Sequence, residues 1–228
     1  MRGEHEIESM KAEGENIRSV LLTGGIGSGK SAVSAYLLSR GVPVYDSDSR
    51  TKALYDSDPF LVPNLENILG KSLRSDDGTF DRKALASVIF SDREALSKVE
   101  SVVHPAVLED FLRWKRDSLE EGWGGYMGDT PFVVMESAIA QEKPLFAGVF
   151  DAVVLVTAPE VIRLERACRR DNSDPEAVLR RIRNQRFDPM KADAIINNDL
   201  SVEELRRRTD LAMGIVQKLL NLHLPSRK

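Results

Sequence analysis

The chain has 228 residues, of which 42% are hydrophobic and 30% are charged, and its formal net charge is -4. This length suits one domain, with or without an inserted subdomain, and is ample for a hydrophobic core. Leu, Ile and Val recur in every segment, which excludes wholesale disorder, and no apolar run approaches the roughly 18 residues of a membrane span. A mildly acidic chain also lacks the excess of positive charge with which proteins bind the phosphates of nucleic acid. We therefore expect neither a membrane nor a nucleic acid as partner.

The N-terminal residues 1–16 are polar, rich in glutamate and without periodicity. They predict a flexible tail, with a short helix as the alternative, and their acidic character differs from that of a signal peptide. The only cysteine, Cys168, cannot form an internal disulfide, so we expect a reducing, cytoplasmic location and interpret Cys168 as a packing residue. For the oligomeric state we expect a monomer or a weak homo-oligomer.

The first predicted strand covers residues 17–23, where Val20 to Leu22 form an apolar run typical of a strand buried on both faces of a parallel sheet. It leads into a glycine-rich turn and then a helix over 31–38, with Gly41 as the stop signal. A short second strand is predicted over 42–45.

Residues 47 to about 120 show no strand pattern. Helical spacing predicts helices over 49–55, 61–69, 82–90 and 91–119, with a turn at 75–78. A long helical block between the strands of an α/β protein is most simply a subdomain inserted on one side of the sheet.

Strand patterns return at 131–135, 152–156 and 194–196. A basic helical stretch over 160–186 precedes the last strand, and residues 202–222 predict a closing amphipathic helix. Strands that alternate with helices in this way predict a five-stranded parallel sheet with right-handed crossovers.

The strongest functional signal is the segment 24–31, which fits G-x-x-x-x-G-K-[ST] between a predicted strand and a predicted helix. Glycines let consecutive backbone N–H groups face an anion, and the helix N-terminus adds partial positive charge. Lys30 supplies a cation to the β- and γ-phosphates, and the Ser31 hydroxyl is a predicted Mg²⁺ ligand. The residues expected to bind the nucleoside triphosphate are Gly25, Ile26, Gly27, Ser28, Gly29, Lys30, Ser31 and Ala32.

Acidic residues follow two of the predicted strands. Asp46 and Asp48 come directly after the second strand, where a carboxylate can orient an acceptor hydroxyl, accept its proton or hold Mg²⁺ through water. The alternative is that Asp46 or Ser47 caps the next helix. Glu136 ends the strand over 131–135, either as a second acidic group near the metal or simply as a polar residue at a strand end.

Eight arginines lie within residues 163–186. Arg166 and Arg170 are four residues apart and share a helix face, from which they could neutralise charge during phosphoryl transfer. The alternatives are a solvated helix face or a basic patch that contacts nucleic acid. His104 stands before Pro105 in a helical block, so it lines a pocket or marks a helix boundary.

Taken together, the motifs LLTGGIGSGKS, VPVYDSD, FDRKAL, VVHP and IINND, with the basic stretch before the last, resemble the dephospho-CoA kinase family over residues 20 to about 210. The resemblance implies a P-loop kinase with a three-layer α/β/α core over 17–48, 128–160 and 192–228. It also implies an inserted helical acceptor-binding part over 49–127 and a helical lid over 161–191. The implied reaction transfers the γ-phosphate of ATP to the ribose 3′-hydroxyl of dephospho-CoA, the last step of coenzyme A synthesis.

The resemblance also implies roles for single residues. Asp48 becomes the base toward the 3′-hydroxyl, while Lys30, Arg166 and Arg170 act on the phosphates. Asn197 and Asn198 fall near the adenine. The implied acceptor-site residues are Asp81, Arg82, His104 and Glu136. After the third strand the family usually has a D-x-P-L-L-F-E-like run, whereas this chain has ESAIAQEKPLF, so acceptor contacts over 138–142 stay open.

Two other functions are compatible with the P-loop. A nucleoside monophosphate kinase shares the loop, insertion and lid but uses another acceptor. A P-loop regulator would switch partners on nucleotide binding, although the chain lacks the N-K-x-D motif with which GTPases read guanine.

Overall fold

The computed structural model describes residues 17–118, 126, 128, 130–185 and 187–222. The predicted N-terminal tail and Arg186 therefore lie outside the described residues. The core is a five-stranded sheet with the order β2-β3-β1-β4-β5, in which every neighbouring pair is parallel, as predicted. Its strands are β1 (Arg18–Gly24), β2 (Val44–Asp46), β3 (Phe132–Glu136), β4 (Ala152–Thr157) and β5 (Ala194–Asn197).

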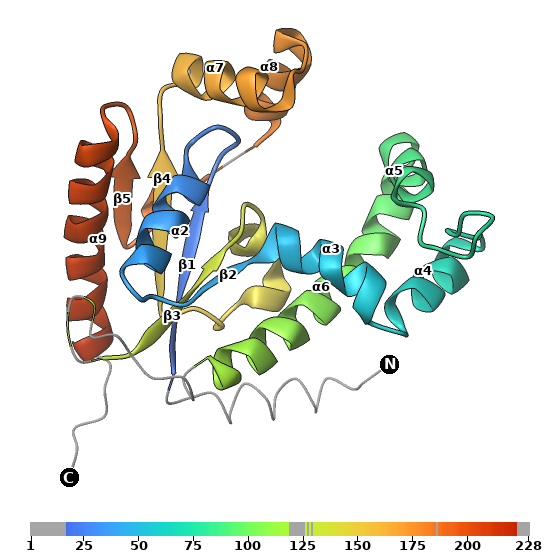
Figure 1. Cartoon of the computed structure of the whole chain (residues 1–228), viewed down its shortest axis with the longest axis horizontal. Helices are drawn as coiled ribbons and strands as arrows, with labels where there is room; N and C mark the ends of the chain where they lie inside the picture. The colour runs from blue at the N-terminus through green and yellow to red at the C-terminus, as the bar shows by residue number, and fades with distance from the viewer. Residues whose placement is uncertain (1–16, 119–125, 127, 129, 186, 223–228) are drawn as a thin grey trace.

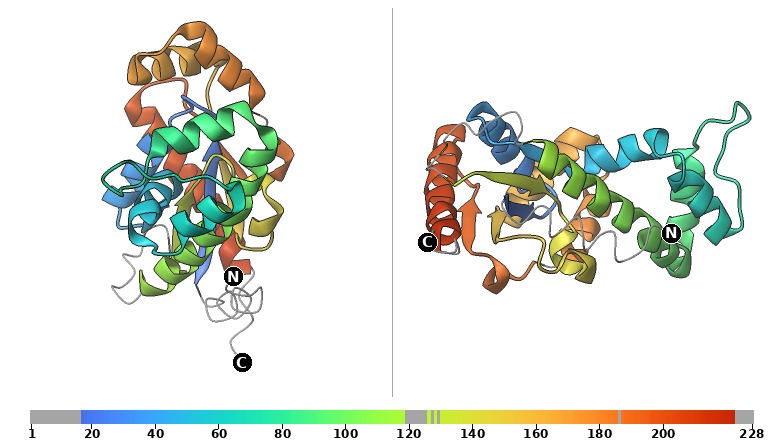
Figure 2. Two further views of the ribbon diagram at one scale, coloured as in Figure 1. Left: turned by 90° about the vertical axis from the view of Figure 1, so that its right-hand side faces the viewer. Right: turned by 90° about the horizontal axis from the view of Figure 1, so that it is seen from below.

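Each face of the sheet carries its own hydrophobic core, because successive side chains of a strand point to opposite faces. In β1, Val20 and Leu22 pack in one core with residues of α2 (Lys30–Ser39) and α9 (Val202–Leu222). Leu21 packs in the other core, against helices of the insertion. Figures 1 and 2 show the resulting arrangement, with the sheet between two layers of helices.

The described part of the segment between β2 and β3 contains four helices and extends to one side of the sheet, away from α9 (Figures 1 and 2). They are α3 (Ser47–Ser57), α4 (Leu61–Leu69), α5 (Arg82–Ser91) and α6 (Arg93–Asp117). Asp92 separates the last two helices by accepting the N–H groups of Glu94 and Ala95 at the start of α6.

The helix α6 continues through Pro105, so the prediction that His104 could mark a helix boundary is wrong. A proline inside a helix costs about 3 kcal/mol. Here the flanking residues Val103, Val107 and Leu108 are buried in the core, and their burial offsets that cost.

The predicted basic helix is in fact a pair, α7 (Glu160–Asp171) and α8 (Pro175–Asn184). Asn172 interrupts it with a left-handed backbone of φ 46°, and Asp174 then caps α8 by accepting the N–H of Ala177. Cys168 packs against the small core between the two helices, as predicted. We call these helices the α7–α8 pair; they lie above the carboxyl ends of the strands in Figure 1.

Three short 3₁₀ helices complete the described structure: η1 (Ala140–Glu142), η2 (Pro144–Phe146) and η3 (Pro189–Lys191). Within the residues described, none of the helices combines the length and the apolar character that crossing a membrane requires.

Candidate active site

The glycine-rich loop joins β1 to α2, where the sequence predicts it. Gly24, Gly27 and Gly29 have φ values of 150°, 73° and 97°, a region that side chains with a Cβ atom rarely adopt. At Gly24 a Cβ atom would also lie 2.2 Å from the carbonyl oxygen of Val156. Gly29 offers no capping side chain to α2, so the first N–H groups of that helix are available to an anion.

Lys30 curls back over this loop. Its Nζ donates to the carbonyl oxygen of Gly24 at 2.7 Å and to that of Gly25 at 3.4 Å. Burial lowers the pKa of Lys30, and the negative charges of Glu136 and Asp48 partly offset this effect. A cation that is partly desolvated beside an open anion site is well placed to meet phosphate oxygens.

Glu136 sits directly beside the start of α2. Its Oε1 accepts the Ser31 hydroxyl at 3.0 Å, and its Oε2 accepts the Ser34 hydroxyl at 2.6 Å. The sheet produces this arrangement, because the end of β3 lies between β1 and β2. The structure thus brings Glu136 to the predicted metal ligand Ser31.

The two aspartates after β2 differ in what they contact. Asp46 caps α3, accepting the N–H groups of Asp48 and Ser49 at 3.0 and 3.2 Å, as the alternative interpretation predicts. The side chain of Asp48 is exposed at the rim of the site. A hydrogen bond to Asp171 raises the pKa of Arg170, and the charge of Asp48 raises it further. Asp48 therefore lies within electrostatic reach of both Lys30 and Arg170.

A buried polar network, which the sequence analysis missed, fixes the start of α3. Asp110 of α6 is 6% exposed and accepts the Tyr45 hydroxyl at 2.8 Å. The same carboxylate accepts two hydrogen bonds from Arg50, at 2.9 and 2.8 Å. Tyr45 and Arg50 flank Asp48 in sequence, so this network sets the position of Asp48. The available signal was Asp110 itself, an acidic residue among the apolar positions of a helix.

The two asparagines after β5 occupy different environments. Asn198 is buried beneath the loop, where its Nδ2 donates to the carbonyl oxygen of Ser28 at 2.8 Å. Arg166 donates to the Asn198 carbonyl oxygen at 2.9 Å. Asn197 is exposed, and its carbonyl oxygen accepts a hydrogen bond from Arg208 at 2.6 Å. Asn198 thus supports the loop and links it to Arg166.

The arginines of α7 differ in the residues to which they donate hydrogen bonds. Arg170 makes two hydrogen bonds to its neighbour Asp171, at 2.6 and 2.9 Å, and is largely exposed. Arg163, which the sequence analysis did not select, donates from its Nε to the carbonyl oxygen of Ile26 at 2.9 Å. Its position three residues before Arg166, on the same side of a helix, was a usable signal.

Three of the predicted acceptor residues, Asp81, Arg82 and His104, lie in the insertion. Asp81 caps α5 by accepting the N–H groups of Lys83 and Ala84, at 2.8 and 3.0 Å. Arg82 donates to Asp56 at 2.7 Å. His104 is half-buried on α6, and this burial lowers its pKa.

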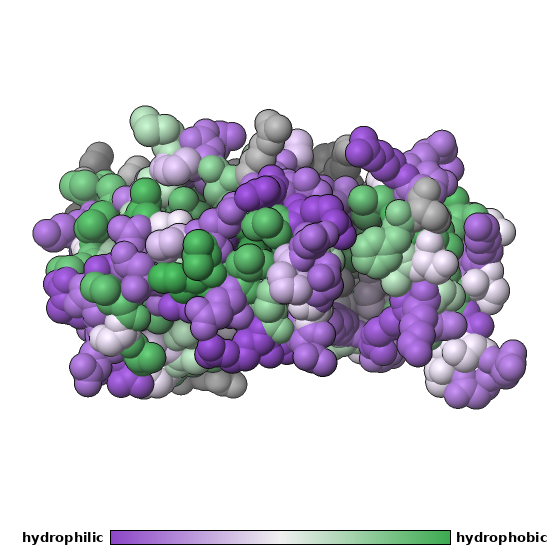
Figure 3. Space-filling model, turned by 90° about the horizontal axis from the view of Figure 1, so that it is seen from above, coloured by the Kyte–Doolittle hydropathy of each residue, from purple (hydrophilic) through white to green (hydrophobic). Residues whose placement is uncertain are grey.

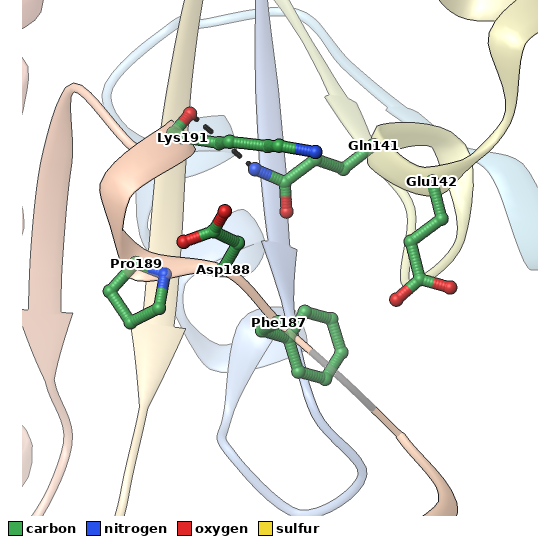
Figure 4. A pocket seen from close by; sticks show the side chains of 6 residues that line it. All are labelled: Gln141, Glu142, Phe187, Asp188, Pro189 and Lys191. Carbon is green, nitrogen blue, oxygen red and sulfur yellow. Dashed lines mark hydrogen bonds between the residues drawn. The ribbon is translucent and has the colours of Figure 1, made fainter.

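Of two adjacent cavities, one borders the loop. One, of about 260 Å³, is lined by Gly25 and Ser28 together with residues of β4 and of the segment around α7 and α8. The other, of about 380 Å³, lies between η1 and η3 and is lined by Gln141, Glu142, Phe187, Asp188, Pro189 and Lys191 (Figure 4). Phe187 and Pro189 line both. Figure 3 looks onto this end of the molecule and shows hydrophilic side chains across its middle.

The segment over 138–142, where the chain departs from the expected motif, contributes to the larger cavity. Gln141 of η1 donates from its Nε2 to the Lys191 carbonyl oxygen of η3 at 3.4 Å. The changed residues thus help to join two short helices that come from distant parts of the sequence.

Comparison with known proteins agrees with this architecture. A chain from Porphyromonas gingivalis named dephospho-CoA kinase is 39% identical over 173 residues, covering 76% of this chain and 80% of its own length. One of the same name from Bacteroides fragilis is 36% identical over 203 residues, covering 87% and 93%. A crystal structure of a Thermus thermophilus protein has a TM-score of 0.68 at 30% identity, covering 92% of this chain and 99% of that one.

A further solved structure, dephospho-CoA kinase from Campylobacter jejuni, has a TM-score of 0.54 at 23% identity and covers 90% of this chain and 98% of its own. At this identity the likeness concerns the fold alone. The family description "Dephospho-CoA kinase" matches residues 18–204, which include all five strands and the complete loop. With this match and the two bacterial relatives, the chain belongs to the dephospho-CoA kinase family.

Proposed function

We propose that the protein transfers the γ-phosphate of ATP to the ribose 3′-hydroxyl of dephospho-CoA and so completes coenzyme A. The observation that carries this proposal is the meeting of three groups at one end of the sheet: the glycine-rich loop, Lys30 and Asp48. An anion site, a cation and a carboxylate within electrostatic reach of one another are what phosphoryl transfer to a hydroxyl requires.

In this proposal ATP binds with its phosphates in the loop. The N–H groups at the start of α2 and the Lys30 ammonium hold the β- and γ-phosphates. Arg166 and Arg170 face the developing charge from the α7–α8 pair, which acts as the lid over 161–191. Asn198 keeps the loop and Arg166 in register beneath the nucleotide. Asn197 stays an adenine contact in this proposal.

Mg²⁺ fits the residues beside the loop. Ser31 and Glu136 present hard oxygen atoms 3.0 Å apart, next to the predicted phosphate site. Among the described residues there is no group of three or more His, Cys, Asp or Glu side chains that could hold a metal ion. This agrees with a cation held by one or two protein oxygens together with substrate phosphates and water. Bound there, Mg²⁺ would neutralise phosphate charge.

Asp48 is the proposed general base. Its exposed carboxylate can reach a hydroxyl that enters from the insertion side, while the Asp110 network holds the helix that carries it. The base accepts the 3′-hydroxyl proton as the oxygen attacks the γ-phosphorus and the bond to the ADP leaving group breaks. We assign acceptor binding to the insertion over 49–127, with Asp81, Arg82 and His104 among its contacts, and the reaction to the cytoplasm.

A coupled ADP-release assay with ATP and Mg²⁺ tests the proposal. Dephospho-CoA is set beside AMP, CMP and shikimate as acceptors, and product masses are read from the same tubes. We expect turnover with dephospho-CoA alone and a product heavier by one phosphate. Turnover with AMP or CMP instead would favour a nucleoside monophosphate kinase and overturn the acceptor.

A further inference from the structure

Ile26, in the glycine-rich loop, is partly buried against the α7–α8 pair. Its side chain packs against the small core of Ala167, Val178 and Ile182 between the two helices. The loop thus contributes one apolar side chain to this contact, and the residues on either side of Ile26 are glycines. A residue of the phosphate site is therefore part of the hydrophobic core of the lid.

Both backbone groups of Ile26 are bonded to residues of the same region. Its N–H donates to Oε1 of Gln185 at 2.7 Å, and its carbonyl oxygen accepts from Nε of Arg163 at 2.9 Å. Arg163 lies in the first turn of α7, and Gln185 follows the last residue of α8. The beginning and the end of the helix pair thus both hydrogen-bond to the backbone of this one residue.

The contact is also close. A Cβ atom at Gly27 would lie 2.2 Å from the backbone oxygen of Arg163, and one at Gly25 would lie 2.1 Å from its Nη2. The glycines on either side of Ile26 therefore allow α7 to rest on the loop backbone. Figure 1 shows the pair α7–α8 directly above the turn between β1 and α2.

This arrangement leaves the Arg163 guanidinium partly unsatisfied. Its Nη2 is buried and has no hydrogen-bond partner among the described residues, and burial lowers the pKa of Arg163. The Ser28 hydroxyl, 1% exposed, is likewise without a partner, and both residues line the cavity of about 260 Å³. The hydrogen bond from Arg163 Nε to the Ile26 carbonyl oxygen joins α7 to the loop.

We propose that Ile26, Arg163 and Gln185 form a latch through which the position of the α7–α8 pair sets the shape of the phosphate loop. The three are positioning residues: they hold the loop backbone so that its remaining N–H groups face the phosphates. Movement of the α7–α8 pair away from the sheet would break the hydrogen bonds of the latch and weaken the binding of phosphate. The transfer assays below rest on the proposed function, whereas the nucleotide-binding measurements test the latch independently of it.

Gln185→Met and Gln185→Glu are the matched variants. Methionine keeps the size of the side chain but removes the oxygen that accepts the Ile26 N–H, whereas glutamate keeps an acceptor. We expect Gln185→Met to weaken binding of a non-hydrolysable ATP analogue, measured calorimetrically without acceptor, about tenfold, as for a buried N–H that loses its partner. In transfer assays its KM for ATP should rise by a similar factor, and its KM for dephospho-CoA should change less than twofold. Gln185→Glu should bind the analogue within about threefold of the parent protein.

Hydrogen exchange read by mass spectrometry tests the coupling itself. Ile26→Ala should speed exchange in the α7 and α8 peptides, and Gln185→Met should speed it in the peptide over 24–30, so each change is felt in the other segment. Arg180→Ala is the control, since Arg180 is exposed on α8 and its ion-pair partner among the described residues is Glu176. It should leave the analogue affinity and the exchange of the loop unchanged.

The proposal is overturned if Gln185→Met binds the analogue normally, if glutamate is as damaging as methionine, or if each variant loosens only its own segment. Should Gln185→Met fail to fold, Ile26→Ala still tests the coupling through exchange in the α7 and α8 peptides, and normal exchange there would overturn the proposal. If the parent protein binds the analogue but does not phosphorylate dephospho-CoA, the proposed function fails while the latch is still tested.

Discussion

The nucleotide side and the acceptor side of this molecule are built in different ways. Around the loop, residues from the ends of β3, β5 and α8 converge on a few consecutive positions: Glu136, Asn198 and Gln185 each bond to it. In the insertion, Asp81 and Arg82 bond to neighbours on α3 and α5. The first site is preorganised by long-range contacts, whereas the second presents residues already engaged in local structure. In the proposed function, Asp81 and Arg82 must exchange these local contacts for contacts with the acceptor.

The largest expected effect comes from Asp48, which stands between the two sides. Replacing it by asparagine removes the proposed base while keeping the shape, so kcat should fall by roughly 10²–10⁴-fold. Affinity for an ATP analogue should change little, because the loop contacts are intact. Steady-state kinetics beside calorimetry measure both quantities. Unchanged turnover would show that Asp48 is not the base. It would also show that Asp48 does not connect the nucleotide side to the acceptor side.

Gly27→Ala tests whether the backbone of the loop tolerates an added Cβ atom. The added Cβ would meet the Arg163 backbone oxygen, and φ is 73° there, so strain of about 1–3 kcal/mol is expected. ATP affinity should fall roughly 5- to 100-fold. Gly70→Ala is the matched control, with φ 62° and no atom within 4 Å of the added Cβ. It should lower stability modestly and leave ATP affinity alone; an equal loss of affinity in both would contradict the argument.

Asp110→Asn tests whether the insertion positions Asp48. The substitution leaves Arg50 without its charged partner, but Arg50 is 44% exposed, so a stability loss of only about 1–3 kcal/mol is expected. The kcat should fall with little change in KM for ATP. Tyr45→Phe, which removes one of the three hydrogen bonds to the carboxylate, should give a smaller loss in the same direction. Thermal melting and kinetics separate the two effects, and a rise in KM for ATP with normal kcat would argue against positioning.

The smallest expected effect is that of replacing Lys30, which should raise the stability of the protein, whereas Asp110→Asn should lower it. Because burial lowers the pKa of Lys30, its charged form is less stable in the folded protein than in the unfolded chain. Lys30→Met should therefore raise the melting temperature of the ligand-free protein by a few degrees at neutral pH. The gain should shrink as pH rises through the folded-state pKa toward about 10.4, the value of an unperturbed lysine. A constant gain across that range would exclude this cause.

The sequence predicted the parts that local rules determine. The loop was recognisable because its backbone demands glycine, and the helix over 202–222 because an amphipathic period runs its whole length. The break at Asn172 was missed, because asparagine in the left-handed region has little signal in a basic stretch. Arg163 was passed over although it lies three residues before Arg166, because spacing indicates a shared helix face but not that this face meets the loop. The capping role of Asp81 was missed because its motif suggested a ligand contact.

The hydrogen bond between Asn198 and Ser28 joins residues 170 positions apart in the chain. The loop is local in sequence, yet its support arrives only when β5 has been added at the edge of the sheet. Closing so long a segment is slow, because much of the chain must be ordered before the contact forms. We therefore expect competence to bind ATP to be acquired late in folding. A nascent chain that lacks its last strand should be unable to draw stability from the nucleotide, whereas the finished protein gains it by mass action.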